Sequence, residues 1–303
     1  MKMDANVVAV LVTYNPFVHD LKESLQSLFS QLNNIIIVDN GSSNADDLHS
    51  MIMDNYKDKV EFIPLSSNKG LSAAQNIGIE QAREKKATHV ILFDQDSHIS
   101  PGFIDSLVST EVLLLSLGEK VAAVGPSFFD SVSLEPYPAT VYCGPFIKRV
   151  DINEITEATF IIASGCLINM SVIEDIGGMK EDLFIDYIDI EWCLRAKNLG
   201  YKVFISPNAK MAHSIGDKRM SIMGRSVSVH NPIRRYYLIR NSFYLMRLSY
   251  VPLGYKLREA VFNFLRFMIS IASSDDKGTY LKYGFLGIRD GLKGNFGPLQ
   301  QKK

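Results

Sequence analysis

The sequence predicts an α/β protein with a mostly parallel central sheet, flanked by helices and followed by a C-terminal helical extension. Residues 7–12 form a continuous apolar, mostly β-branched run, which is typical of a strand buried on both faces. Leu21, Leu25 and Leu28 then place one apolar stripe on a helix, and residues 35–38 form a second buried strand. Strand, helix and strand in this order predict a right-handed crossover and a parallel sheet.

The later segments continue this alternation. Further strands are expected at residues 60–64, 88–93 and 201–206, and helices at residues 71–83 and 189–199. The spacing of Ser171 and Glu174 predicts a capping box at the start of a short helix. From residue 226 the sequence becomes rich in aromatic and basic residues with a helical pattern. We therefore predict one large α/β domain over residues 1–225 and a helical extension over residues 226–303.

Composition narrows the class of protein. The 303 residues carry a formal net charge of -1, with 47% hydrophobic and 21% charged residues, so no excess of basic charge points to a nucleic-acid partner. Cys143, Cys166 and Cys193 are odd in number and form no C-x-x-C pair, which argues against a disulfide framework or a zinc site. The first apolar run is too short for a spanning helix, so we expect a cytoplasmic protein.

Polar segments follow several of the predicted strands, at residues 13–15, 39–42, 68–70 and 94–96. In parallel sheets ligands bind beyond the carboxyl ends of the strands, where these segments meet. Asp94 and Asp96 repel each other unless a cation lies between them, and their oxygens suit Mg²⁺ or Mn²⁺. The spacing alone also fits an ordinary turn or helix cap, because D-x-D is common.

Taken together, these segments resemble a known family. TYNP at 13–16, VDNGS at 38–42, NKG at 68–70, NIG at 76–78 and FDQDS at 93–97 resemble glycosyltransferase family 2, whose members are inverting enzymes with the GT-A fold. The FDQDS segment is most similar to bacterial rhamnosyltransferases of polysaccharide and O-antigen synthesis. The resemblance implies transfer of L-rhamnose from dTDP-β-L-rhamnose to a lipid-linked saccharide acceptor.

The resemblance also implies roles for individual residues. It assigns a divalent cation, Mg²⁺ or Mn²⁺, to Asp96 and to His213, which follows the last predicted strand. Asp39 can instead form a turn with Gly41, and Gly70 can instead mark a helix entry. The residues implied for the nucleotide donor are Thr13, Asn15, Asp39, Asn68, Gly70, Asn76, Asp94 and Gln95.

An acidic segment before the helix at 189–199 is the candidate for the catalytic base. Asp186, Asp189 and Glu191 all lie there, although acids also favour helix N-termini because of the macrodipole. The resemblance places the general base on Asp189, but Ile188 replaces the acid that usually precedes it. The choice among Asp189, Glu191 and Asp186 therefore stays open.

The extension contains two features of interest. Arg234 and Arg240 lie in a basic, tyrosine-rich segment that could bind the diphosphate or an anionic lipid carrier, or could be a solvated helix face. Residues 251–271 alternate apolar residues with basic ones, which is unfavourable for a transmembrane span. An amphipathic helix on an anionic membrane surface and a helix in a homo-oligomer interface both fit this pattern.

Two other functional classes compete with a transferase. A nucleotidyltransferase also uses a nucleotide, a cation and paired aspartates, but it usually has a glycine-rich loop after the first strand, and residues 13–16 contain no glycine. A non-catalytic protein that binds nucleotide sugars or glycans would keep the fold without turnover. A nicotinamide dehydrogenase is disfavoured because no G-x-G-x-x-G follows the first strand.

Overall fold

The computed structural model describes residues 5–130, 135–212, 219–222, 225–228 and 231–300. A nine-stranded sheet forms the centre, in the order β3-β2-β1-β4-β10-β6-β11-β5, with β9 paired to β11. Its strands are β1 (Val7–Thr13), β2 (Ile35–Asp39), β3 (Val60–Pro64), β4 (His89–Asp94), β5 (His98–Ile99), β6 (Val121–Phe129), β9 (Thr156–Ala158), β10 (Cys166–Asn169) and β11 (Lys202–Ala212). Two hairpins stand apart from it, β7 (Ala139–Cys143) with β8 (Phe146–Val150) and β12 (Arg219–Ile222) with β13 (Arg225–Ser228).

The parallel sheet predicted from the sequence is confirmed in its first half. β1 pairs in parallel with β2 and with β4, and β2 pairs in parallel with β3. β10 then runs antiparallel between β4 and β6, which makes the whole sheet mixed. The polar segments after β1, β2 and β4 consequently lie at one edge.

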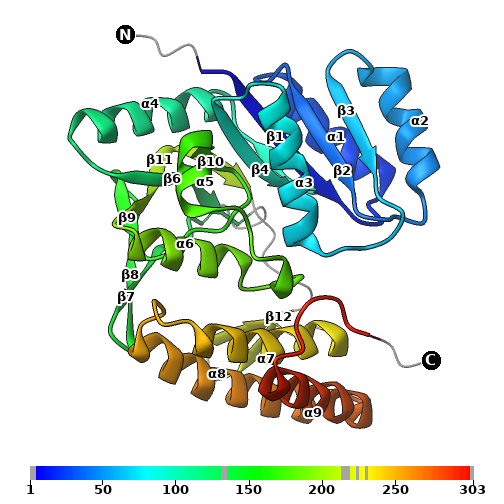
Figure 1. Ribbon diagram of the computed structural model, residues 1–303, viewed down its shortest axis with the longest axis vertical. Helices are drawn as coiled ribbons and strands as arrows, with labels where there is room; N and C mark the ends of the chain where they lie inside the picture. Colours follow the sequence, from blue (N-terminus) through cyan, green and yellow to red (C-terminus); the bar gives the residue numbers. More distant parts are fainter. Residues whose placement is uncertain (1–4, 131–134, 213–218, 223–224, 229–230, 301–303) are drawn as a thin grey trace.

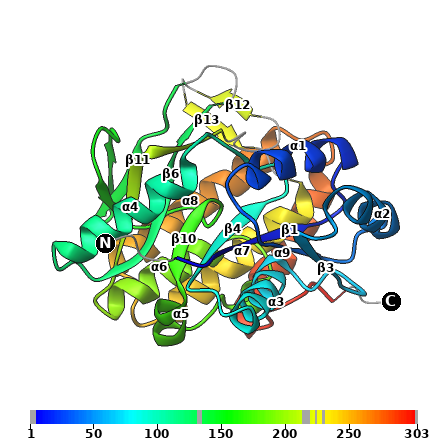
Figure 2. The ribbon, with the colours of Figure 1, turned by 90° about the horizontal axis from the view of Figure 1, so that it is seen from above.

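Helices cover both faces of this sheet (Figures 1 and 2). One face packs against α1 (Val18–Phe29), α2 (Ala45–Tyr56) and α4 (Phe103–Ser116). The other face packs against α3 (Leu71–Glu84), α5 (Met170–Ile176) and α6 (Ile188–Asn198). Alternate residues of β1 point to the two sides, so the continuous apolar run at 7–12 is explained by burial on both faces.

Two details differ from the sequence prediction. The cap of α5 is Asn169, whose side chain accepts a hydrogen bond from the Ser171 backbone N–H, so Ser171 is already helical and the predicted capping box is wrong. The predicted boundary at residue 226 falls inside the β12–β13 hairpin. The helical extension itself begins with α7 at Pro232, after the Asn231 cap.

The extension consists of three packed helices, α7 (Pro232–Arg247), α8 (Leu253–Ala272) and α9 (Lys277–Lys293). Figure 1 shows them as a layer below the α/β domain, on the side where α6 lies. Small residues allow α9 to lie close to α7, because a Cβ on Gly287 would come within 2.8 Å of the Tyr236 carbonyl oxygen. Within the described parts of the chain, no helix combines the length and apolar content that crossing a bilayer requires.

The contact between α3 and β1 gives a first testable prediction. A Cβ on Gly78 would lie 2.2 Å from Val10 Cγ1, whereas one on Gly278, near the start of α9, would meet only ordinary contacts. We expect Gly78→Ala to lower the free energy of unfolding by about 1–3 kcal/mol through overpacking. Gly278→Ala is the matched control and should raise it by up to about 1 kcal/mol. Urea denaturation measures both, and equal effects would contradict the tight α3–β1 packing.

Candidate active site

The strand ends bring the predicted donor residues to one edge of the sheet. Thr13 pairs with Asp39 across β1 and β2, and Val12 pairs with Asp94 across β1 and β4. The last residues of three adjacent parallel strands therefore stand side by side. This is the arrangement that the polar segments predicted.

Asp39 organises the turn after β2. Its carboxylate accepts hydrogen bonds from the Thr13 hydroxyl at 2.9 Å and from the Ser42 backbone N–H at 2.9 Å, and the Ser42 hydroxyl also donates to it. The side chain is fully buried. The turn is thus closed through Ser42 rather than Gly41, and any contact of Asp39 with a nucleotide base remains a prediction.

Three amide side chains connect the loops that follow the strands. The Tyr14 backbone N–H donates to Gln95 Oε1 at 2.8 Å, which ties the loop after β1 to the loop after β4. Asn15, in the left-handed region at φ 47°, accepts from the Ser43 backbone N–H at 2.8 Å. Asn40, which sequence reasoning did not single out, accepts from the Lys69 backbone N–H at 2.8 Å. These contacts fix the rim of the site.

Gly70 and Asn76 connect this rim to the acidic segment. Gly70 has φ +94° at the start of α3, and a Cβ there would lie within 2.9 Å of Phe184, so the close approach requires glycine. Asn68 Oδ1 accepts from the Gly70 N–H at 2.9 Å. Asn76 exchanges two hydrogen bonds with the Met179 backbone, at 2.8 and 2.9 Å. The Asn76 amide therefore holds the segment after α5, and its predicted donor contact has no support in this geometry.

The carboxylates Asp94, Asp96 and Asp189 share one electrostatic environment. Burial and, to a smaller extent, the negative charges of Asp96 and Asp189 together raise the pKa of Asp94 to about 6, while Arg234 opposes them. Asp94 and Asp189 are partly buried and Asp96 is exposed. Convergence of three acids from β4, the following turn and α6 is the central feature of the site.

The three candidate bases have different environments. Asp189 has no ion pair among the described residues, and burial raises its pKa to about 6, with a smaller contribution from the charge of Asp186. Asp186 accepts from Arg234, with 3.0 Å between Arg234 Nη2 and Asp186 Oδ1 and 3.2 Å from Arg234 Nε to each carboxylate oxygen. Glu191 is fully buried and accepts from Arg195 at 2.9 and 3.0 Å and from Tyr250. Glu191 is therefore a buried partner of Arg195, and a catalytic role for it stays a prediction that this environment does not favour.

The two predicted arginines also differ. Arg234 lies in the first turn of α7, partly exposed and paired with Asp186 at the site. Arg240 is fully buried and donates to the backbone carbonyls of Asp182 at 3.1 Å, Leu183 at 3.2 Å and Gly297. Arg240 is therefore a structural residue and does not reach a diphosphate.

The backbone before α6 is strained. Phe184, Asp186 and Tyr187 have φ values of 63°, 64° and 64°, which is unfavourable for residues other than glycine. Phe184 is the centre of a tight turn in which the Ile185 N–H donates to the Leu183 carbonyl at 2.7 Å. We call residues 183–187 the catalytic loop, because it leads directly into Asp189, the residue predicted to act as base.

Polar residues of the C-terminal helices hold the catalytic loop, and sequence reasoning missed them. Asn241 Nδ2 donates to the carbonyls of Leu183 at 2.8 Å, Ile185 at 2.7 Å and Asp186 at 3.2 Å. The Tyr187 hydroxyl donates to Glu259 at 2.9 Å and accepts from Asn263 at 2.8 Å. The available signal was the presence of Glu259 and Asn263 four residues apart, on one side of a helix whose other charged residues are all basic.

The predicted cation site is tested only in part. His213 lies outside the described residues, so its pairing with Asp96 stays a prediction. Among the described residues, no group of three His, Cys, Asp or Glu side chains is arranged to hold a metal ion. The residues present nevertheless fit a cation, because Asp96 supplies hard oxygen donors beside Asp94, whose pKa its charge raises.

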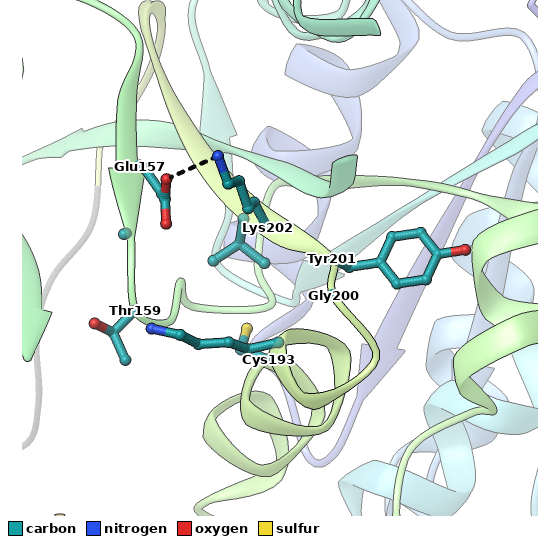
Figure 3. A pocket seen from close by; sticks show the side chains of 9 residues that line it. Glu157, Thr159, Cys193, Gly200, Tyr201 and Lys202 are labelled. Atoms are coloured by element: carbon teal, nitrogen blue, oxygen red, sulfur yellow. Dashed lines mark ion pairs between the residues drawn. The ribbon is translucent and has the colours of Figure 1, made fainter. Parts of the chain in front are cut away.

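A separate cavity of about 210 Å³ lies at the start of β11 (Figure 3). Glu157, Cys193, Tyr201 and Lys202 are among its lining residues, and Lys202 Nζ lies 3.5 Å from Glu157 Oε2. Lys202 is the first residue of a strand parallel to β6, so the cavity is at the edge of the sheet opposite Asp94. It contains no predicted site residue.

Comparisons with known proteins agree with this geometry. The family model described as glycosyl transferase family 2 matches residues 8–177. The dTDP-rhamnosyl transferase RfbF of Shigella flexneri is 38% identical over 301 residues, which cover 96% of this chain and 97% of that protein.

Solved structures support the fold. GalNAc-T7, solved with UDP, GalNAc and Mn²⁺, is similar with a TM-score of 0.59 and 16% identity. The matched region covers 88% of this chain and 56% of GalNAc-T7. The mannosyltransferase PcManGT from Pyrobaculum calidifontis, solved with GDP-Man and Mn²⁺, gives a TM-score of 0.59 and 14% identity over 97% of this chain and 89% of that one. The GT-A fold and its C-terminal helices are thereby confirmed.

The shared electrostatic environment of the acids is testable by titration. Asp189→Asn removes one negative charge that raises the pKa of Asp94, so that pKa should fall from about 6. Carboxyl-carbon NMR titration of the metal-free protein measures the change. Asp105→Asn, in the first turn of α4, is the control and should leave the titration of Asp94 as it was. An unchanged Asp94 in the Asp189→Asn variant would show that the two carboxyls do not share a site.

Proposed function

Because the chain belongs to glycosyltransferase family 2, we propose that it transfers L-rhamnose from dTDP-β-L-rhamnose to a lipid-linked saccharide with inversion. The observation that carries the proposal is the convergence of Asp94 and Asp96, at the end of β4, with Asp189 in the first turn of α6. The donor sugar is supported by the name of the Shigella flexneri relative, which matches over almost its whole length.

Donor binding is assigned to the rim of the site. We place Thr13 at the thymine base, with Asp39 acting chiefly through the turn that it closes. Asn68 and Gly70 border the ribose, and Gln95 and Asn15 hold the loops around it. Asp94 faces the ribose from the end of β4.

The cation is assigned to Asp96, with His213 as a second protein ligand. Mn²⁺ in the two solved neighbours supports a divalent ion, and either Mg²⁺ or Mn²⁺ suits a carboxylate site. When bound, the ion supplies stabilisation of the negative charge that develops on the leaving diphosphate. Arg234, beside Asp186 at the same site, adds a positive charge from the protein itself.

Asp189 is the general base of the proposed mechanism. The acceptor hydroxyl is a weak nucleophile until its proton is removed, and a raised carboxyl pKa strengthens the base. Of the three acids, Asp186 is held by Arg234 and Glu191 by Arg195, which leaves Asp189 to take the proton. In a single displacement, attack from the face opposite the diphosphate inverts the anomeric centre.

The donor and the reaction type are tested by product analysis. We expect dTDP to be released when the protein, Mn²⁺ and dTDP-rhamnose are mixed with lipid-linked saccharides extracted from the source organism. EDTA should abolish release, and added Mn²⁺ or Mg²⁺ should restore it, because the cation stabilises the leaving diphosphate. UDP-glucose serves as the control donor. Release of pyrophosphate would instead indicate a nucleotidyltransferase.

The choice of base is tested by two neighbouring substitutions. Asp189→Asn should lower kcat by about 10²–10⁴-fold with dTDP affinity nearly unchanged, because only proton removal is lost. Glu191→Gln should act on stability, since breaking a buried ion pair costs about 3–5 kcal/mol.

The pH dependence follows from the same assignment. The rate of the unsubstituted enzyme should fall as the pH decreases through about 6, where Asp189 becomes protonated.

Rapid-quench kinetics and urea denaturation separate the effect of Asp189→Asn on the rate from the effect of Glu191→Gln on stability. Full turnover by Asp189→Asn would rule out its role as base.

A further inference from the structure

Helix α8 has an inverted distribution of side chains. Every exposed position of this helix carries an apolar residue, and Phe264 and Leu253 are 63% and 70% exposed. The buried positions, by contrast, include Glu259, Asn263 and Ser270. The exposed residues are Leu253, Leu257, Ala260, Val261, Phe264, Leu265, Met268 and Ala272. A water-exposed helix of an isolated protein normally has the opposite arrangement.

Two buried polar residues of α8 form hydrogen bonds to the catalytic loop. Glu259 and Asn263 bind the Tyr187 hydroxyl of the catalytic loop, and Glu259 also pairs with Arg258 and Arg266 at 3.2 and 3.4 Å. The outward apolar residues make no comparable contribution to the fold. Their exposure therefore calls for an external partner.

Neighbouring elements extend the same surface. Gly284 of α9 lies against Phe267 of α8, since a Cβ there would come within 2.1 Å of the ring. Leu281, Phe285 and Leu292 are exposed on α9, at positions about 60–100° around the helix from Gly284. Figure 1 shows α8 and α9 side by side at the base of the molecule, farthest from the sheet.

The β7–β8 hairpin continues the surface at its other end. Gly254, at the start of α8, contacts the hairpin turn, where a Cβ would lie 2.6 Å from the Gly144 carbonyl carbon. Phe146, next to that turn, is 74% exposed. We call the exposed apolar residues of α8, α9 and this turn the basal apolar face.

The exposed charged residues on helices α8 and α9 are all basic. The exposed positions of α9 include Lys277, Lys282, Arg289 and Lys293. Neither α8 nor α9, both described in full, has an acidic residue at an exposed position. Asp275 and Asp276 are exposed in the turn that connects the two helices.

We propose that the basal apolar face docks on the surface of an anionic lipid bilayer. Apolar side chains enter the boundary of the acyl chains, and the lysine and arginine side chains meet the anionic headgroups. A second copy of this chain fits less well, because a two-fold contact places identical patches together. That contact would bring the cations of α9 toward each other with no exposed acid on either helix.

Docking in this orientation has a geometric consequence for the site. Only α8 separates the basal apolar face from Tyr187, so the catalytic loop would lie about one helix diameter, ~10 Å, from the membrane surface. An acceptor saccharide carried on a lipid could reach Asp189 across that distance. Docking itself does not depend on the identity of the donor sugar.

Vesicle binding tests the proposal. The full chain is sedimented with phosphatidylglycerol–phosphatidylcholine vesicles and with vesicles of phosphatidylcholine alone. We expect binding to the anionic vesicles that weakens with added salt. Binding should fall at least about tenfold in Leu257→Glu/Phe264→Glu, because two apolar side chains that would enter the bilayer are lost. The variant Lys282→Glu/Lys293→Glu should bind the anionic vesicles more weakly, and its binding to phosphatidylcholine vesicles should not change.

The matched control is Leu117→Glu, a 70% exposed leucine that follows α4, far from α8, and it should bind vesicles like the unsubstituted chain. Thermal shift with dTDP checks that every variant remains folded. Light scattering after size exclusion should give a monomer. Unchanged vesicle binding in Leu257→Glu/Phe264→Glu would overturn the proposal. A dimer in solution that this variant converts to monomer would also overturn it and identify the face as a subunit interface.

Discussion

The catalytic loop at 183–187 depends on hydrogen bonds from outside the α/β domain. Non-glycine residues in left-handed conformations cost about 1–3 kcal/mol each and persist only where surrounding contacts determine them. Here one amide, that of Asn241, binds three carbonyls of the loop, and Arg240 binds one of the same three, that of Leu183, together with the preceding carbonyl of Asp182. The position of Asp189 therefore depends on α7 as much as on α6.

This dependence changes the meaning of the C-terminal extension. The matched family model ends at residue 177, before the catalytic loop, whereas the match to the Shigella flexneri relative extends over 96% of the chain. Helices α7 and α8 of the extension bind the loop directly, through Asn241, Glu259 and Asn263. The hydrogen bonds from α7 and α8 hold the loop in its strained backbone conformation.

Sequence patterns could predict what depends on the sheet. Continuous apolar runs identified β1, β2 and β4, and the rule for parallel strand ends brought Thr13, Asp39 and Asp94 together. Sequence patterns could not distinguish charged residues at the site from charged residues in the interior, because this distinction depends on the direction of each side chain. Asp189 and Glu191 are two positions apart, about 200° around a helix, so one faces the site and the other the interior. Arg234 and Arg240 are six positions apart, about 240° around α7, so these two side chains also point in different directions.

The pattern of α8 shows a deeper limit of sequence reasoning. Periodicity identifies an apolar face but does not state whether that face meets the protein or something outside it. The usual assumption, that apolar residues point inward, fails in α8 because the inner positions must satisfy the buried Tyr187 hydroxyl. With Glu259 and Asn263 at inner positions, Leu257, Phe264 and Leu265 lie on the outer side of the same helix. The polar support of the catalytic loop and the basal apolar face are thus two consequences of one helix.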